Sequence, residues 1–300
     1  MAEDLIDNAQ IIQFSSYVHV LAQQLKSRLR PHVELRPMTG DQMAYDGIGP
    51  VEASPVVGRN PRVEFSDINH LRRLIARQRF TLTLPIDEHD VRGMMEDPQS
   101  LYAKACVYAM ARVFDRVVVA ALFATVYTGR TFATAVSAAN DGVVTQTATG
   151  GLTYAQLIAI HKTFMDNDVG NDVEGEISER LVMGIAGNEY VSLMQEVELI
   201  NDLYSQGYVI DKGRIAEAAG IRLLQFAANA PKPVLSVASS VRACFAMSTR
   251  GICVGMSKEF ALKVEPRPDL VETKQVQINF DFGAVRTEGV LIQQVNTTAS

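Results

Sequence analysis

Hydrophobic residues recur at helical spacing in two long segments of the chain. Within residues 5–29 the apolar side chains fall close to one stripe, and Pro31 closes the segment. Within residues 98–128, pairs of apolar residues recur every four positions. Asp97 and Pro98 form a strong helix start, and Gly129 favours a helix end. The pattern predicts an N-terminal helix and a second helix of about 30 residues, roughly 45 Å long.

Alternating residues predict strands on either side of a segment that has no periodicity. Residues 32–36 and 71–84 have extended patterns, and residues 37–70 between them are rich in proline and glycine. We expect residues 71–84 to form one strand with an apolar face (Leu74, Ala76, Phe80, Leu82 and Leu84) and a polar face (Arg73, Arg77, Arg79, Thr81 and Thr83). Two long strands with a turn-rich tip then form an excursion. Because such loops are uncommon inside a compact domain, the tip is a lid, is disordered, or gains its order from a neighbouring molecule.

The rest of the chain mixes short helices and strands. Helical patterns cover residues 152–165 and about 188–203, and short apolar strands are expected at 180–185, 221–226, 234–237 and 243–247. Near the C-terminus, Val276, Ile278, Phe280 and Phe282 alternate with polar residues, and a last strand covers 290–295. The sequence therefore predicts an α+β chain with a mixed middle region and a β-structured tail.

Composition narrows the class of protein. The 300 residues are 47% hydrophobic and carry a formal net charge of −6, which is ordinary for a globular chain and unusual for a duplex-DNA reader. The three cysteines, Cys106, Cys244 and Cys253, lack the spacing of a disulfide framework or a zinc site, so we expect free thiols. The most apolar long stretch, residues 105–127, has charged residues in its middle, which argues against a membrane span.

Motifs for catalysis are largely missing. The richest cluster is His89 with Asp87, Glu88 and Asp90, which suits either a metal ligand or general base, or a polar connector before the long helix. We find no phosphate-binding loop, no dinucleotide fingerprint and no complete nucleophile elbow, and the acidic segment 166–179 lacks the ligand order of a calcium loop. We therefore expect no catalytic residue, no bound cofactor and no metal site.

Charge is distributed unevenly along the chain. The excursion is basic and segment 166–179 is acidic, and each is either a solvated surface or a contact with a neighbouring subunit. Our candidates for inter-subunit contacts are Arg59, Arg62, Arg73, Arg77, Arg79, Asp166, Asp168, Asp172, Glu174 and Glu176. We expect Arg77 and Arg79 in particular to pair with carboxylates of an adjacent subunit.

The order of these parts resembles the major capsid proteins of tailed bacteriophages, with the Hong Kong 97-type fold. Ser27-Arg28-Leu29-Arg30-Pro31 resembles the end of the family's N-terminal arm, and Phe282-Gly283-Ala284-Val285-Arg286 followed by Gly289-Val290 resembles its closing strands. Asp90-Val91-Arg92, Asp97-Pro98-Gln99-Ser100, Tyr102-Ala103-Lys104 and Ala111-Arg112-Val113-Phe114-Asp115 resemble the stretch leading into and along the spine helix in one branch of the family. The resemblance covers nearly the whole chain.

The resemblance implies a domain organisation and a set of partners. It implies an N-terminal arm (1–31), an extended loop (32–84), a peripheral domain (85–150) with a spine helix (98–128), an axial domain (151–255) and returning peripheral strands (256–300). It implies that the protein assembles with itself into pentamers and hexamers of an icosahedral shell. Further implied partners are a separate scaffolding protein, a portal, a cement protein and DNA packaged non-specifically on the inner face. Assembly would occur in the host bacterial cytoplasm, and the protein would reside in the virion.

Two departures from the family pattern matter. Some members crosslink covalently through a lysine of the extended loop, but no lysine occurs between Lys26 and Lys104, so we expect no such crosslink. Some members begin with a charged coiled-coil scaffold segment, whereas this sequence goes directly into the arm. Two alternatives stay open: an encapsulin-like nanocompartment shell, and an α/β enzyme with residues 37–70 as a lid and His89 beside Asp87 or Asp90 in its site.

Overall fold

The computed structural model describes residues 23–53, 55, 67–87, 98–148, 150–170, 180–196, 210–211, 214–267 and 273–298. Most of the predicted N-terminal helix, the tip of the excursion and His89 lie outside these ranges. The chain divides into two compact units. Unit 1 comprises Met1–Lys26, Arg79–Arg112 and Lys258–Asp281, and unit 2 comprises Ser27–Gln78, Val113–Ser257 and Phe282–Ser300. Helices and strands are mixed throughout, which confirms the predicted α+β class.

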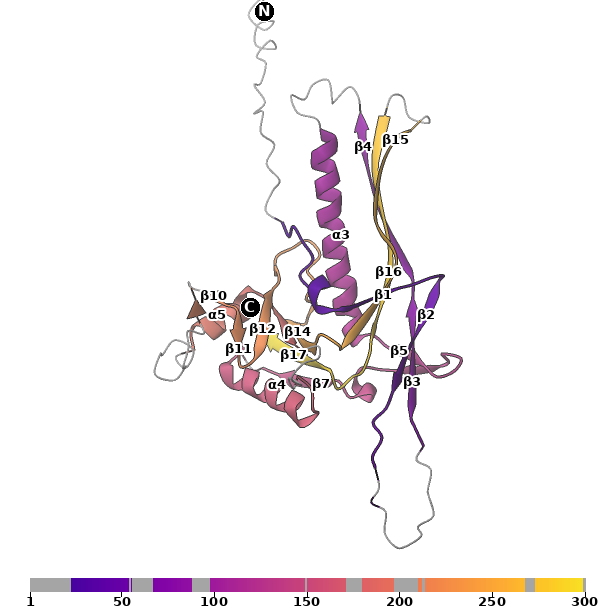
Figure 1. The fold of residues 1–300 in the computed structure, drawn as a ribbon. Coiled ribbons are helices and arrows are strands. Elements are labelled where there is room, and N and C mark those ends of the chain that lie inside the picture. The colour runs from indigo at the N-terminus through magenta and orange to yellow at the C-terminus, as the bar shows by residue number, and fades with distance from the viewer. Residues whose placement is uncertain are drawn as a thin grey trace, which may run out of the picture. The chain divides into compact units, whose positions relative to one another are not determined.

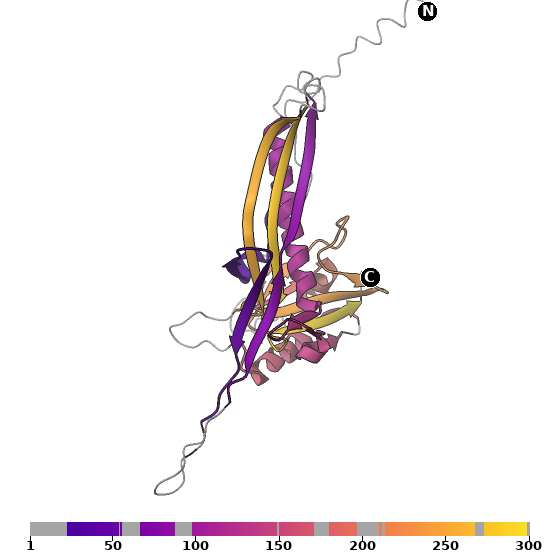
Figure 2. The same cartoon turned by 90° about the vertical axis from the view of Figure 1, so that its right-hand side faces the viewer.

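Unit 1 is organised around long strands. These are β4 (Gln78–Asp87), β15 (Ile252–Arg267) and β16 (Thr273–Arg286), which lie in the order β15-β16-β4 in one sheet. Along β16, Val276, Ile278 and Phe280 are buried, and the residues between them face the other way. The first half of helix α3 (Pro98–Phe123) runs alongside these strands (Figures 1 and 2). The alternation predicted for residues 275–282 is therefore confirmed.

Helix α3 confirms the predicted long helix but ends earlier than expected. It stops at Phe123 instead of residue 128, because Val126–Thr128 forms strand β5. Strand β5 pairs with β6 (Thr134–Val136) and touches strand β3 (His70–Ala76) at Arg73. Val126 is 3% exposed, so burial in this sheet competes successfully with continuation of the helix.

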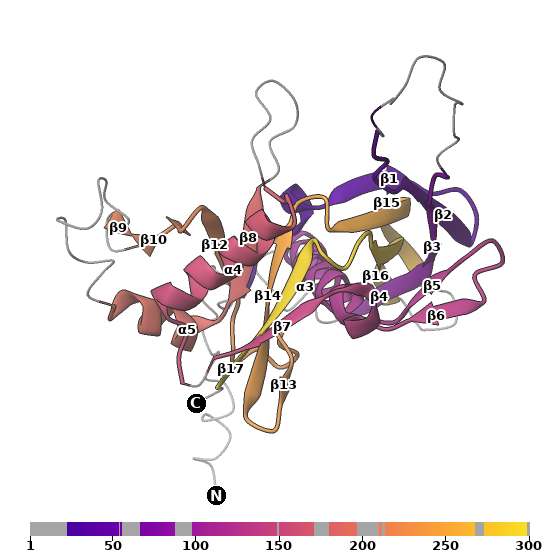
Figure 3. The same ribbon diagram turned by 90° about the horizontal axis from the view of Figure 1, so that it is seen from below.

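Unit 2 contains a seven-stranded sheet with helices beside it. Its strand order is β11-β12-β8-β14-β17-β7, with β13 paired to β14. The strands are β7 (Val144–Thr147), β8 (Leu181–Ile185), β11 (Glu217–Ala218), β12 (Ile221–Gln225), β13 (Val237–Ala238), β14 (Val241–Ser248) and β17 (Ile292–Thr298). Helix α4 (Tyr154–Asp166) lies beside this sheet, where Gln293 donates a 3.0 Å hydrogen bond to the Ile160 carbonyl (Figure 3). Helix α5 (Gly187–Met194) follows β8, and a small antiparallel pair, β9 (Ile210–Asp211) and β10 (Arg214–Ile215), also belongs to this unit.

The excursion differs from its prediction in pairing. Strand β1 (Glu34–Pro37), which follows the short helix η1 (Arg30–His32), pairs in parallel with the start of β15. The hairpin is formed instead by β2 (Gln42–Ile48) and β3 in antiparallel register, so the strand lies inside the segment expected to be irregular. We call residues 42–53 and 67–76 the hairpin. In β2 only one face is partly buried, and polar residues such as Gln42 and Asp46 lie on the exposed face. The strand therefore lacks a continuous apolar pattern in the sequence and was not predicted.

Residues 71–84 are two strands and not one. The strand conformation is interrupted at Arg77, between β3 and β4. In β4 the expected alternation holds, with Arg79, Thr81 and Thr83 exposed. In β3 it is inverted, because Arg73 is buried and Ile75 is inaccessible while Ala76 is exposed. A single residue between two strands changes which face is buried, so the placement of Arg73 on a solvated face was wrong.

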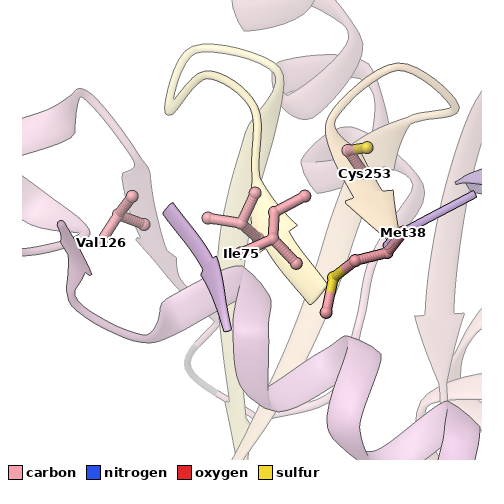
Figure 4. Close-up of a cluster of buried hydrophobic side chains, with 5 residues drawn as sticks. Met38, Ile75, Val126 and Cys253 are labelled. Atoms are coloured by element: carbon pink, nitrogen blue, oxygen red, sulfur yellow. The ribbon is translucent and has the colours of Figure 1, made fainter. Parts of the chain in front are cut away.

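The base of the hairpin packs into a small apolar cluster of unit 2. Ile75 lies between Val126 and Met38, with Cys253 nearby (Figure 4). Val285 completes the cluster, and Met43 and Tyr45 pack against it.

The backbones of β16 and β3 approach each other closely at Gly283. A Cβ on Gly283 would lie 2.2 Å from the Ala76 carbonyl oxygen, so this close backbone approach requires glycine.

Candidate inter-subunit contact site

The predicted contact residues fall into three groups. Arg59, Arg62, Asp172, Glu174 and Glu176 lie outside the described residues. Asp166 and Asp168 are exposed at and after the end of α4, as expected for a solvated acidic segment. Arg73, Arg77 and Arg79 are described, and each has a carboxylate partner within its own chain.

Arg73 belongs to a buried ion cluster in unit 2. Its two terminal nitrogens each lie 2.7 Å from one oxygen of Asp141, which sits in helix η2 (Ala139–Asp141). Arg286 Nε lies 2.6 Å from Asp141 Oδ2. Burial by itself would raise the pKa of Asp141, but hydrogen bonds from the two arginines outweigh it and lower this pKa below its ordinary value. Arg73 therefore stabilises its own subunit and is not available to a neighbour.

Arg286 also completes the end of the long helix. Its Nη1 donates to the Leu122 carbonyl at 2.7 Å and to the Ala124 carbonyl at 3.0 Å. The last carbonyls of a helix lack partners within the helix and favour a positive charge. Arg73 in turn donates to the Arg286 carbonyl at 3.2 Å. The cluster thus joins the base of the hairpin, the end of α3 and the end of β16, although these residues are far apart in the sequence.

A second anchor holds the segment where the N-terminal arm is expected to end. Asp115 of α3 is fully buried and accepts hydrogen bonds from Ser27 Oγ at 2.5 Å and from the backbone N–H groups of Arg28 and Leu29. Ser27 Oγ also accepts from the Arg30 N–H at 3.0 Å. The acid within the apolar stretch 105–127 therefore has an internal partner, which sequence patterns alone did not identify.

Arg79 differs from the other two arginines, because it lines a groove. Arg77 pairs with Asp41, directly before the hairpin, whereas the Arg79 side chain is 69% exposed and its Nε lies 3.4 Å from Asp281. The groove has a volume of about 390 Å³ and lies on the face of the β4–β16–β15 sheet opposite Val276, Ile278 and Phe280. Its lining residues are all polar: Arg79, Thr81, Lys258, Gln277, Asn279 and Asp281.

The outer end of the hairpin is apolar and acidic. Ile48 is 70% exposed, and Val51 and Ile68 are each about half exposed. Glu52 and Asp67, next to these aliphatic residues, are also exposed, and within the described part of the chain neither makes an ion pair. Several large aliphatic side chains exposed close together are typical of a surface that is covered by another molecule.

The described residues offer little for catalysis. They contain no group of three or more metal-ligating side chains that could hold an ion, and no described helix is long and apolar enough to cross a membrane. The cysteines are free and buried, and burial raises the pKa of the Cys244 and Cys253 thiols to about 12. His89, Glu88 and Asp90 lie outside the described residues.

Comparisons with known proteins identify the family. The family model described as "Phage capsid protein" matches residues 6–293. Among solved structures, the capsid of cyanophage P-SCSP1u has a TM-score of 0.73 at 13% identity, covering 98% of this chain and 95% of that chain. The Helicobacter pylori bacteriophage KHP30 capsid has a TM-score of 0.72 at 11% identity, covering 98% and 97%. The Ralstonia phage GP4 capsid has a TM-score of 0.66 at 13% identity, covering 97% and 96%.

A comparison with curated protein sequences gives no significant match. The fold is nevertheless the capsid fold over nearly the full length, and it favours neither a nanocompartment shell nor an α/β enzyme. The protein is structural and has a major capsid role, forms a multi-subunit shell with copies of itself, and resides in the virion. The chain belongs to the phage capsid protein family.

Proposed function

We propose that this chain forms the icosahedral head shell of a tailed bacteriophage, as pentamers and hexamers that enclose the genome. The observation that carries the proposal is the hairpin, whose outer end exposes Ile48, Val51 and Ile68. A protruding pair of strands has too little apolar surface to bury on itself. Contacts with other copies supply that burial in a closed assembly.

We propose the domain roles as implied by the resemblance. Residues 1–31 form the arm, 32–84 the extended loop, 85–150 and 256–300 the peripheral domain, and 151–255 the axial domain around the fivefold and sixfold positions. The buried anchors support the first two roles. Asp115 holds residues 27–29 and the Arg73–Asp141–Arg286 cluster holds the base of the hairpin, so the end of the arm and the base of the extended loop are each fixed by buried hydrogen bonds.

We propose further partners of the assembled shell: a separate scaffolding protein, a portal, a cement protein, and DNA on the inner face. A chain with a net charge of −6 has no strong overall attraction to phosphates, which supports weak and non-specific DNA contact. We also propose that assembly takes place in the host bacterial cytoplasm.

Particle formation tests the proposal. The purified protein is examined by negative-stain electron microscopy and mass photometry, alone and with the candidate scaffolding protein. Hollow particles of megadalton mass are expected, and DNA in particles from infected cells distinguishes a phage head from a compartment that holds protein cargo. A uniform small oligomer under both conditions would overturn the shell assignment.

A further inference from the structure

We propose that three arginines of unit 2, Arg28, Arg180 and Arg222, bind the phosphate groups of DNA. We call them the arginine cluster. The inference rests on the proposed shell, in which DNA lies against the inner face, and it names the residues that meet the DNA. It also assigns one face of the seven-stranded sheet to the inside of the shell.

Two of these arginines lie on the same face of the seven-stranded sheet. Strands β8 and β12 are parallel neighbours, and Arg222 is paired in register with Val182. Arg180 lies two residues before Val182, and its carbonyl accepts a hydrogen bond from the Thr249 N–H at 3.1 Å, so the sheet pairing extends to this position. Because side chains two residues apart share one face of a strand, the exposed side chains of Arg180 and Arg222 lie on the same side.

The end of the arm adds the third arginine to this face. Phe226 follows β12 on the side where Arg222 lies, and the Arg28 guanidinium carbon is 5.7 Å from the centre of the Phe226 ring. The backbone N–H of Arg28 donates to Asp115 at 3.1 Å, which fixes this segment. A guanidinium held over an aromatic ring keeps N–H groups at its edge available for an oxyanion.

The arginine cluster has no acid that neutralises it. Within the described part of the chain none of the three arginines makes an ion pair, and Glu217, the partner of Arg222 in the β11–β12 ladder, forms none with it. The nearby imidazole of His32 is 7% exposed. Burial lowers the pKa of His32, and the positive charges of Arg222 and Arg180 lower it further. Positive potential is therefore concentrated here, although the whole chain carries a net charge of −6.

The chemistry of this face favours DNA over an acidic protein segment. Arginine binds phosphate oxygens with paired N–H groups, and the positions of Arg222 and Phe226 are about 13 Å apart along the strand, which suits a repeating polyanion better than one small anion. Val182 and Phe226 are already buried at 0% and 3% exposure, so these two apolar residues offer almost no surface to a protein partner. Contacts with the DNA backbone need charge and do not need such a surface.

DNA affinity of the purified subunit tests the arginine cluster. Binding of a fluorescein-labelled random-sequence duplex is followed by fluorescence anisotropy over a range of salt concentrations. We expect Arg180→Gln with Arg222→Gln to weaken binding about tenfold at low salt. We also expect the slope of log K against log salt to fall by about two, because each lost phosphate contact removes about 0.9.

Matched variants separate position from total charge. Arg130→Gln removes an exposed arginine from the turn between β5 and β6, outside the arginine cluster, and should leave the affinity unchanged. Arg180→Lys with Arg222→Lys keeps both charges and should keep most of the affinity, and thermal unfolding shows that each variant is folded. Displacement of the duplex by poly-L-glutamate as effectively as by unlabelled DNA would show that phosphate is not preferred and would overturn the assignment.

The outcomes distinguish this inference from the proposed function. If the wild type forms particles and the double glutamine variant binds DNA as tightly as the wild type does, the arginine cluster is not the DNA site and the shell proposal stands. If the wild type forms no particles under any condition, the shell proposal itself fails.

A cysteine at the arginine cluster tests which side of the shell this face occupies. The three native thiols are buried, so Arg222→Cys supplies the reactive thiol. We expect a small maleimide to label this cysteine in empty shells but not in DNA-filled heads, and a bulky polyethylene-glycol maleimide to label neither. Labelling of intact particles by the bulky reagent would place this face outside. Protection from the small reagent in empty shells would show that a neighbouring subunit covers it, and either result overturns the inference.

Discussion

At the scale of single residues, Asp141 is the carboxylate that neutralises two buried arginines. It compensates Arg73 and Arg286, both almost inaccessible to solvent. We expect Asp141→Asn to lower the free energy of unfolding by about 3 kcal/mol, because two buried guanidinium groups lose their counter-charge. Chemical denaturation of the unassembled subunit measures this loss, and Asp166→Asn, an exposed acid at the end of α4, is the control expected to change little.

The same acid predicts a pH dependence of stability. The pKa of Asp141 is lowered in the folded chain, so the unfolded chain binds the proton more readily. Its contribution to stability is complete above the ordinary pKa of an aspartate and is lost as the pH falls through the folded-state pKa. We expect the difference in unfolding free energy between wild type and Asp141→Asn to shrink under acidic conditions, and a difference that stays constant would contradict this assignment.

The cysteines lead to a third prediction at this scale. Burial raises the pKa of Cys244 and Cys253 to about 12, so few thiolates exist near neutral pH. We expect iodoacetamide to leave the folded subunit unmodified at pH 8 and to label all three cysteines after denaturation, as counted by intact-protein mass spectrometry. Rapid labelling of the folded chain would show that these thiols are accessible.

At the scale of elements, the close approach between β16 and the end of β3 depends on Gly283. A methyl group there would meet the Ala76 carbonyl at 2.2 Å. We expect Gly283→Ala to destabilise the subunit by roughly 2 kcal/mol or more, since one of the two strands must move. Gly187→Ala is the matched control, because nothing lies within 4 Å of its added Cβ and alanine favours helix α5. Equal melting temperatures for the two variants would contradict this explanation.

Sequence patterns at the element scale succeeded where one physical requirement dominates. The spine helix was predicted because a cap, a proline and a repeated apolar pattern agree, and β16 because one of its faces is buried. Strand β2 was missed because the alternation of apolar and polar residues in its sequence is weak. The wrong face of β3 was predicted to be buried, because the break between strands at Arg77 has no clear signal in the sequence. The end of α3 was also misplaced, because long-range pairing of Val126–Thr128 overrides local helix preference.

At the scale of the whole molecule, the absence of lysine from residues 27–103 predicts the chemistry of the shell. With no lysine in the extended loop, no lysine-derived crosslink can form there. We expect virions boiled in denaturant to release a monomer of 32.9 kDa, as seen on a denaturing gel. A ladder of covalent multimers would show that another crosslink operates.

The linear order of helices, strands and turn-rich segments was sufficient to indicate the α+β class and the resemblance to phage capsid proteins. These features depend on local periodicity and on composition, which are properties of the chain itself. Only the tertiary structure showed that Arg73 is buried with Asp141, that Asp115 anchors residues 27–29, and that Arg79 and Lys258 line one groove. Each of these arrangements joins residues distant in sequence, and their free energy comes from desolvation and pairing in three dimensions, for which local patterns carry no signal.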